Sequence, residues 1–315
     1  MTVLAAIQAA PILFDKAAST QKACQLIDEA ARQGADIASF GETWLPGYPF
    51  FIEAPLSDLW WEANALYLEN AVTLDGPEIK AICGAARRAG IDVVIGIAEL
   101  DAATGGSIYA TLVFISAEGE VLGRHRKIKP THHERSVWSD GDAQGLKVHS
   151  RPYGRLSALN CWEHNILLPG FTLITQGTQY HVAAWPGREP DIAPSEPVWS
   201  RQLLLSRAFA SQAGAYVMAP AGLRLDEHVP ERFRPLHTFE HTGQSAIIDP
   251  RGEVIAGLAE GETILLAKAD PAEVRKAKAA CDPAGHYSRP DLFELRLEGR
   301  RIYPTGPNAS AVEDA

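Results

Sequence analysis

The sequence predicts an α/β domain with layered sheets, and three observations support this prediction. Short apolar segments, such as IDVVIGIA at 91–98, alternate along the chain with segments of helical periodicity. Polar or charged residues come directly after several apolar segments, where open α/β sheets commonly place their functional groups. The composition, 46% hydrophobic and 22% charged over 315 residues, is that of an ordinary globular protein.

The chain opens with a predicted strand and a predicted helix. Residues 2–9 (TVLAAIQA) form a mostly apolar run that is typical of a strand. Ser19 or Thr20 can cap the start of the helix, and Gly34 ends it. The apolar positions of this helix recur at helical spacing: Ala23, Leu26, Ile27, Ala30 and Ala31.

The later elements continue the alternation and imply one domain. We expect helices at 77–89, 162–177 and 196–213, and strands at 37–40, 91–98, 108–115, 120–127, 180–184, 215–219, 244–249 and 262–268. Because no repeat of fixed short period and no low-complexity linker divides the chain, residues 1–281 are expected to form a single domain. Residues 282–315, rich in Pro and charge, are expected to form a tail that docks on the domain surface or on a partner subunit.

Charge and cysteine content exclude several classes of partner. The formal net charge is -10, from 29 basic and 39 acidic residues, which argues against nucleic acid or an anionic membrane. No segment reaches the roughly 18 apolar residues that a membrane span needs. No Lys or Arg precedes the apolar residues 3–14, so no signal peptide is expected. The 4 cysteines form no CxxC pair, which favours free thiols in a cytoplasmic setting.

Three segments place a reactive side chain at the end of a predicted strand. Glu42 lies in FGETWLPGYPF, Lys127 in GRHRKIKPTHHERSVWSDGD, and Cys161 in LNCWEH. Each residue alone has an ordinary structural explanation, as an exposed loop carboxylate, an edge lysine or a small core hydrophobe. For the cysteine, the polar neighbours Asn160 and Glu163 argue against an apolar core.

Together these segments resemble the nitrilase superfamily of carbon-nitrogen hydrolases, and most of all its true nitrilases, including the cyanide-hydrolysing enzymes. The family's catalytic Glu, Lys and Cys follow three separate strands in that chain order, and the resemblance assigns them to Glu42, Lys127 and Cys161. A second family glutamate, in the lysine loop, falls on Glu134. The match runs from about residue 3 to residue 297, and its further strings are GDAQGL, QGTQYHVAAWPG, IIDPRGEVIA and GHYSRPDLF.

The resemblance implies a fold, an activity and a mode of assembly. The implied fold is a four-layer α-β-β-α sandwich. The implied activity is hydrolysis of an organic nitrile to the carboxylic acid and ammonia, through a thioimidate and then an acyl-thioester on Cys161, with no metal or organic cofactor. Members of the family pair across their helices into dimers and often build larger spirals, so we expect a homo-oligomer.

The chemistry of these side chains agrees with that activity. A nitrile carbon needs a strong, soft nucleophile, but a free cysteine is mostly thiol at neutral pH. Glu42 can take the proton of Cys161, and Lys127 can favour the thiolate. Lys127 and the backbone N–H of Trp162 are expected to stabilise the negative charge that develops on the nitrile nitrogen. A carboxylate near that nitrogen, for which Glu134 is the candidate, is expected to favour loss of ammonia over loss of the thiolate.

The pocket for a small nitrile should be mainly apolar, with few polar anchors. We expect Tyr48, Trp162 and Trp185 to form its walls, because these aromatic residues stand in or beside the motifs. The sequence leaves open whether the nitrile is aliphatic, aromatic, arylaliphatic or cyanide itself.

Three alternatives use other substrates or other chemistry. A cyanide hydratase or dihydratase, or an amidase, would use the same Glu-Lys-Cys triad. The segment HTFEH fits the H-x-x-E-H pattern of inverted zinc proteases, so a zinc hydrolase would use His237, Glu240 and His241. Such a site needs both histidines on one helical face. Pro235 and Thr238 disfavour a helix here, and a loop leading to a strand is the favoured interpretation.

Overall fold

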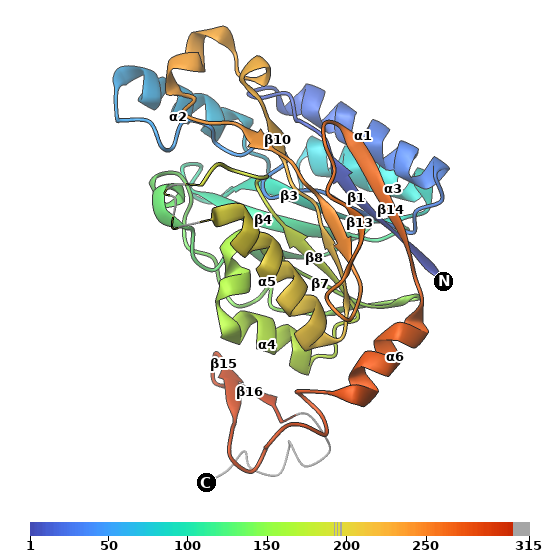
Figure 1. The fold of residues 1–315 in the computed structure, drawn as a ribbon. Coiled ribbons are helices and arrows are strands. Elements are labelled where there is room, and N and C mark those ends of the chain that lie inside the picture. The colour runs from blue at the N-terminus through green and yellow to red at the C-terminus, as the bar shows by residue number, and fades with distance from the viewer. Residues whose placement is uncertain (192, 194, 196, 305–315) are drawn as a thin grey trace.

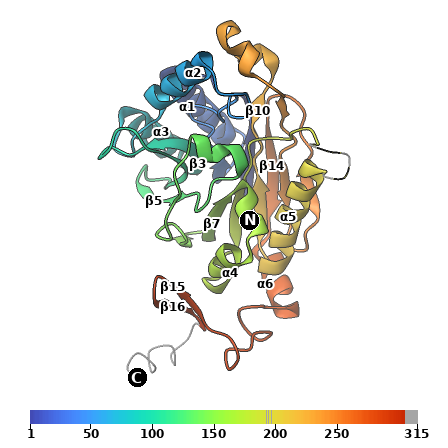
Figure 2. The same cartoon turned by 90° about the vertical axis from the view of Figure 1, so that its left-hand side faces the viewer.

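The computed structural model describes residues 1–191, 193, 195 and 197–304. Its centre consists of two six-stranded sheets packed face to face, and helices cover the outer face of each sheet (Figures 1 and 2). The layers therefore follow the order helix, sheet, sheet, helix. This arrangement confirms the four-layer α-β-β-α sandwich predicted above.

The first sheet joins the beginning of the chain to a strand near its end. Its central strands β1, β2 and β3 are parallel, and β14 pairs antiparallel with β1. In spatial order the strands are β14 (Thr263–Ala269), β1 (Thr2–Gln8), β2 (Ile37–Ser39), β3 (Asp92–Leu100), β4 (Ile108–Ile115) and β5 (Val121–Arg126).

The second sheet has the same number of strands and a parallel centre of its own. Strands β7, β8 and β9 are parallel, and antiparallel strands flank them on both sides. In spatial order the strands are β13 (Val254–Gly257), β12 (Ala246–Ile248), β9 (Tyr216–Ala219), β8 (Tyr180–Ala184), β7 (Gly154–Asn160) and β6 (His149–Arg151).

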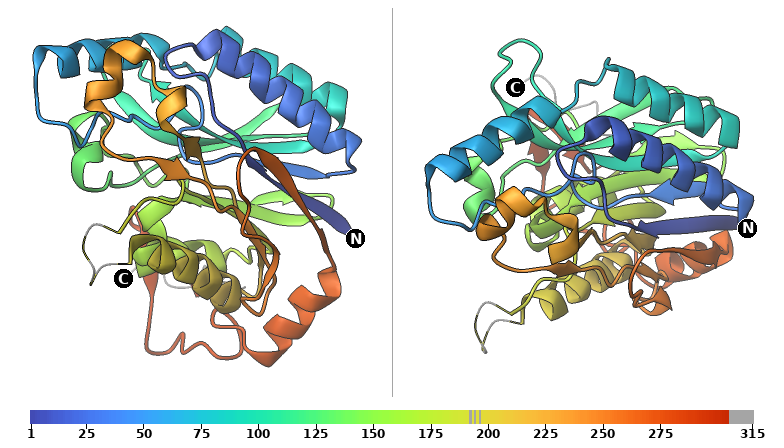
Figure 3. Two further views of the ribbon diagram at one scale, coloured as in Figure 1. Left: turned by 45° about the horizontal axis from the view of Figure 1, so that its top comes forward. Right: turned by 90° about the horizontal axis from the view of Figure 1, so that it is seen from above.

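The helices connect the parallel strands and cover the sheets. Helices α1 (Lys16–Arg32), α2 (Asp58–Asn70) and α3 (Pro77–Ala89) lie on the side of the first sheet, as the two views in Figure 3 show. Helices α4 (Leu167–Thr175) and α5 (Val198–Ala213) lie on the side of the second sheet, and α6 (Pro271–Ala280) follows β14. No helix among the described residues is both long and apolar enough to span a bilayer.

Strand periodicity explains how one chain supplies separate cores between these layers. In β1, Leu4 and Ala6 point into the core between the two sheets, whereas Ala5 and Ile7 point into the core under α1 and α3. Side chains of a strand alternate between its two faces, so a strand buried on both faces must be apolar at successive positions. This explains the apolar run 93–98 within β3.

Helix boundaries differ from the prediction in places where local caps decide them. The first helix is capped by Asp15, whose side chain accepts from the N–H of Ala18, and not by Ser19 or Thr20. The predicted helix 162–177 is wrong over its first turn, because the 3-10 turn η2 (Cys161–Asn165) precedes α4. Helices α2 and α6 were not predicted, although Ser57 and Asp270 stand as caps directly before them.

The described part of the tail folds back onto the same chain. Strands β15 (Leu295–Leu297) and β16 (Arg300–Tyr303) form a hairpin below α4 in Figure 1. The ring of Tyr303 lies 5.4 Å from the ring of Phe171 on α4, and Leu297 packs beside Leu159 and Leu173. The hairpin therefore docks on the domain surface through aromatic and aliphatic contacts.

Candidate active site

The site lies where loops from both sheets meet. Glu42 follows β2, Lys127 follows β5, and Cys161 follows β7 as the first residue of η2. The side chains are almost completely buried, with 2%, 1% and 2% of their surface exposed. The loop after β2 approaches the second sheet closely, because a Cβ on Gly41 would lie 2.8 Å from the carbonyl oxygen of Trp185. That same carbonyl accepts the backbone N–H of Glu42 at 3.2 Å.

One ammonium group holds two carboxylates beside the thiol. Nζ of Lys127 lies 2.8 Å from Oε1 of Glu42 and 2.6 Å from Oε2 of Glu134. One carboxylate oxygen of each glutamate and Sγ of Cys161 all lie within 4.8 Å of one another. Such a group of acidic and thiol ligands could hold a metal ion, but the lysine ammonium already supplies a positive charge between the carboxylates. The structure therefore brings all four residues predicted as catalytic into one buried cluster.

The two glutamates differ in their hydrogen bonds. Glu134 accepts from the hydroxyl of Tyr48 at 2.9 Å, from the N–H of Thr131 at 2.6 Å and from Lys127. The contact between Lys127 and Glu42 lacks hydrogen-bond alignment, and neither oxygen of Glu42 has a hydrogen-bond partner among the described residues. Glu42 therefore keeps lone pairs that can receive a proton from the thiol of Cys161.

Burial and neighbouring charges shift the protonation of this cluster. Burial raises the pKa of Glu42 to about 8, although the charge of Lys127 opposes this shift. Burial, together with the charge of Glu42, raises the pKa of the Cys161 thiol well above its ordinary value. Burial alone would lower the pKa of Lys127, but Glu134 and Glu42 raise that pKa well above its usual range. The resting site therefore holds a protonated thiol beside a charged ammonium group.

The turn that carries the nucleophile is strained and braced. Cys161 has a φ of 45°, which is uncommon for a residue other than glycine. The carboxylate of Glu163 accepts the backbone N–H groups of Asn160 and Ile128, both at 2.8 Å, and pairs with Nε2 of His125. Because Ile128 follows Lys127 in the chain, this brace ties the thiol turn to the lysine loop. The N-x-x-E spacing within LNCWEH is a sequence signal for this brace, because a glutamate at the third position of a turn can accept the backbone N–H of the residue before the turn, as Glu163 does from Asn160.

A cavity of about 760 Å³ opens onto Cys161 and Glu134. Its apolar lining includes Tyr48, Ile52, Trp162, Pro186, Val198 and Phe239. Such a volume and lining suit a small organic substrate.

Comparison with known proteins identifies the family. Residues 3–279 match the family model described as carbon-nitrogen hydrolase. The chain belongs to the carbon-nitrogen hydrolase family. The resemblance drawn from the sequence motifs is thereby confirmed for the family as a whole.

Several curated members of the family are similar to this chain over nearly its whole length. "Nitrilase 2" from an unknown prokaryotic organism is 49% identical over 94% of this chain and 92% of its own length. An "Aliphatic nitrilase" from Rhodococcus rhodochrous is 36% identical over 98% of this chain and 86% of its own. An "Arylacetonitrilase" from Hypocrea virens is 36% identical, with 93% and 90% covered.

Solved structures of carbon-nitrogen hydrolases share the fold. A Saccharomyces cerevisiae protein of the nitrilase superfamily aligns with a TM-score of 0.71 at 20% identity, over 93% of this chain and 97% of its own. An amidase from Nesterenkonia aligns with a TM-score of 0.64 at 20% identity, over 89% of this chain and 94% of its own. At such identities the comparison supports the fold alone.

The three aromatic residues predicted as pocket walls have different positions in this hydrolase. Tyr48 and Trp162 line the cavity, but Trp185 does not. Trp185 is 1% exposed, and its indole N–H donates to Ser206 on α5 at 2.9 Å. The prediction for Trp185 is corrected for a simple reason: strand alternation places it, like Ala183, on the face of β8 that packs under α5.

The zinc alternative lacks the local structure that it requires. His237 and Glu240 lie outside any helix or strand. His241 begins the short strand β11 (His241–Thr242), which pairs with β10 (Leu223–Arg224). The imidazole of His237 contacts Asp226 at 2.7 Å. The two histidines therefore do not share a helical face, and the favoured interpretation as a loop leading to a strand is correct.

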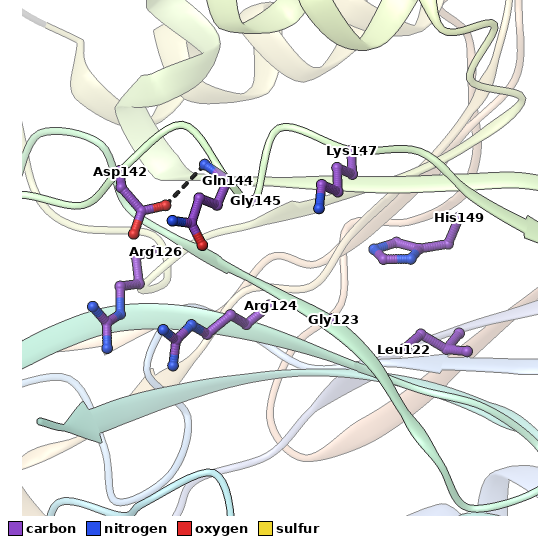
Figure 4. A pocket seen from close by; sticks show the side chains of 9 residues that line it. All are labelled: Leu122, Gly123, Arg124, Arg126, Asp142, Gln144, Gly145, Lys147 and His149. Carbon is purple, nitrogen blue, oxygen red and sulfur yellow. Dashed lines mark hydrogen bonds between the residues drawn. The ribbon is translucent and has the colours of Figure 1, made fainter. Parts of the chain in front are cut away.

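Another cavity, of about 140 Å³, lies away from Cys161 and is drawn in Figure 4. Arg124 and Arg126 point into it from β5, near Asp142 and Lys147. Both arginines form ion pairs with the buried Glu99, Arg126 at 2.6 Å. Their charges therefore serve to neutralise a buried carboxylate, and the residues that line this cavity include no cysteine, serine or threonine.

Proposed function

We propose that this carbon-nitrogen hydrolase is a nitrilase, which converts a small organic nitrile to its carboxylic acid and ammonia. The observation that carries the proposal is a buried thiol, Cys161, beside the buried ion pair of Glu42 and Lys127. Among the described residues the oxygens of Glu42 accept no hydrogen bond. Three curated relatives are named as nitrilases, and these names support nitriles as the substrate class. One of the names specifies aliphatic nitriles and another specifies arylacetonitriles.

The first half of the reaction forms a thioimidate. Glu42 takes the thiol proton as Sγ of Cys161 attacks the nitrile carbon. The nitrile nitrogen then gains negative charge, which Lys127 and the backbone N–H of Trp162 stabilise. One such donor contributes roughly 3 to 4 kcal/mol to the transition state. The nitrogen takes up a proton from the cluster, which yields the neutral thioimidate.

The second half consumes two waters. Glu42 assists the first water to add to the thioimidate carbon, and the tetrahedral intermediate expels ammonia to leave an acyl-thioester on Cys161. The second water attacks the thioester, so that the carboxylic acid leaves and the thiol is restored. In this scheme Glu134 holds Lys127 in place and favours protonation of the departing nitrogen.

Ammonia release tests the proposal directly. The wild-type enzyme is expected to release ammonia from phenylacetonitrile faster than from phenylacetamide, and the reverse order would indicate an amidase. Potassium cyanide in the same assay covers the cyanide-hydrolysing alternatives. Cys161→Ala should lose turnover while its circular dichroism spectrum is unchanged, because the thiol is the nucleophile.

Lys127→Met provides a second arm of this test. A neutral side chain of similar length cannot stabilise the charge on the nitrile nitrogen, so kcat should fall by about a hundredfold or more. A mass adduct from a slowly processed nitrile should map to Cys161. An adduct on Cys24, Cys83 or Cys281 instead, or near-normal kcat in the methionine variant, would refute these roles.

We also propose the organisation of the chain around this function. Residues 1–281 would form the catalytic domain, and residues 282–315 a tail for docking and oligomer contacts. The hairpin of the tail packs on α4, while Leu292 and Phe293 remain 61% and 67% exposed. A cytoplasmic location is consistent with four free cysteines.

A further inference from the structure

The cavity beside Cys161 contains acidic side chains that the proposed chemistry does not use. Glu53 and Glu189 both line it, together with the apolar residues named above. In the part of the chain that the structure describes, neither carboxylate forms an ion pair with a lysine or an arginine. Partial burial of these two carboxylates without such partners is costly, and it raises the pKa of both, that of Glu189 to about 7.

Glu189 is held in place on one side only. Gln202 on α5, which is 0% exposed, donates its Nε2 to Oε1 of Glu189 at 3.0 Å. The other oxygen, Oε2, lies 3.9 Å from Nε2 of His241, which is too long for a hydrogen bond. Burial keeps the pKa of His241 well below its ordinary value, so this imidazole is neutral and supplies no counter-charge. One oxygen of a fixed carboxylate is therefore left to accept a hydrogen bond.

Glu53 adds a second carboxylate on the same side of the cavity. Its Oε2 is buried without a hydrogen-bond partner among the described residues. Arg224 is 3% exposed, and its guanidinium lies over the rings of Tyr48 and Phe239, which line the cavity. This guanidinium donates to the carbonyl of Phe239 at 3.0 Å but makes no ion pair with either glutamate. The charge of Arg224 therefore lowers the negative potential of the two glutamates without pairing with them. Both carboxylates still face the cavity.

We propose that the enzyme prefers nitriles that carry a hydrogen-bond donor, a hydroxyl or an ammonium group, and that Glu189 is the residue that accepts it. This inference rests on the nitrilase function proposed above. A substrate donor replaces the water that Glu189 loses when the cavity fills, whereas a methyl group in the same place leaves the carboxylate oxygen without a partner.

Three isosteric nitriles test the proposal. They are 3-hydroxybutyronitrile, 3-aminobutyronitrile and 3-methylbutyronitrile, with kcat/KM measured by ammonia release against enzyme-free blanks. In the wild-type enzyme the hydroxyl and amino compounds should each exceed the methyl compound by about tenfold. Glu189→Leu removes the acceptor and should bring both ratios close to one. Glu189→Gln keeps an acceptor oxygen but loses the charge, so only the ratio for the amino compound should fall.

Glu260→Gln is the matched control, because Glu260 is exposed and lies outside the cavity lining. It should leave both ratios unchanged. Unchanged ratios in Glu189→Leu, or a wild-type preference for the methyl compound, would overturn the inference while the nitrilase function stands. No ammonia from any nitrile would overturn the proposed function itself. If circular dichroism shows that the leucine variant is unfolded, Glu189→Gln becomes the deciding variant. An unchanged ratio for the amino compound in that variant then rejects the role of Glu189 as the acceptor.

Discussion

Glu42 and Glu134 contact the same ammonium group, yet their surroundings suit them to different roles. Three donors hold Glu134 in place. Glu42 has no aligned donor among the described residues and has a pKa raised to about 8. Two neighbouring carboxylates in different environments commonly take different roles, one as the base and the other as a positioning group.

The pKa of Glu42 predicts the pH dependence of turnover. Below that pKa the carboxyl is protonated and cannot take the thiol proton, whereas above it the base is available. We therefore expect kcat/KM for a nitrile to rise with pH through about 8, as an apparent pKa of the coupled Glu42 and Cys161 pair. A pH-rate profile from roughly pH 6 to roughly pH 10 checks this. Activity that is flat or falls across this range in folded enzyme contradicts it.

Replacing Glu134 should change the products and not only the rate. The tetrahedral intermediate can expel ammonia, which leads to acid, or the thiolate, which gives amide. Glu134→Gln removes a charge that favours the protonated nitrogen, so the amide-to-acid ratio should rise. A difference of about 1.4 kcal/mol between the two exits changes the ratio tenfold. Chromatography of one reaction quantifies both products.

Two outcomes separate the roles open to Glu134. A lower rate with an unchanged product ratio would leave it as a residue that only orients Lys127. Tyr48→Phe is the companion variant, since it removes one donor to Glu134 but keeps the carboxylate charge. Its product ratio should stay close to that of the wild type.

At the scale of elements, hydrogen bonds of the short turn η2 connect the two sheets. Cys161 adopts its positive φ at the end of β7, and Glu163 two residues later reaches across to the loop after β5. Burial opposes ionisation of Glu163, but the partner His125 and two backbone N–H groups keep its pKa below the ordinary value. The turn is therefore stabilised by contacts with a different sheet, and the geometry of the nucleophile depends on them.

Removing this brace should weaken both stability and catalysis. Glu163→Ala leaves His125 and the N–H groups of Asn160 and Ile128 buried without their acceptor. We expect a loss of about 3 to 5 kcal/mol in the free energy of unfolding. Urea denaturation measures this, with the exposed Glu120→Ala as control. In the fraction that remains folded, kcat should fall more than KM rises, and a change in KM alone would argue against the brace.

At the scale of the whole molecule, apolar side chains remain on the outer helix layer. Leu167 and Leu168 on α4 are 77% and 61% exposed, and Leu204 on the neighbouring α5 is 60% exposed (Figure 1). The tail residues Leu292 and Phe293 are exposed as well. Exposed apolar side chains on one layer commonly mark protein–protein contacts.

We therefore expect a homo-oligomer of this 34.1 kDa chain. Light scattering coupled to size-exclusion chromatography should give at least twice the chain mass at working concentrations. Leu204→Glu should shift the distribution towards smaller species, because a charge in an apolar interface is costly to bury. A mass equal to one chain for the wild type across the concentration range would reject the prediction.

Much of this architecture could be predicted from local sequence. Strand β4 and helix α3 have the predicted bounds, since hydrophobic periodicity records which faces of an element are buried. The catalytic residues were also predicted. Glu42, Lys127 and Cys161 each follow a predicted strand in a recognisable motif, and the family resemblance assigned a second glutamate to Glu134 in the lysine loop. These features are readable because each depends on neighbours within a few residues along the chain.

Only the tertiary structure decided which other groups surround that cluster. Tyr48 reaches Glu134 across 86 residues and His125 reaches Glu163 across 38, while Trp185 packs under a helix and not against the cavity. The side of the cavity that carries Glu189 depends on how α5 and the loop after β8 approach the first sheet. Such contacts join segments that are distant in sequence, and their energies arise only when the two sheets pack, so no local pattern along the chain records them.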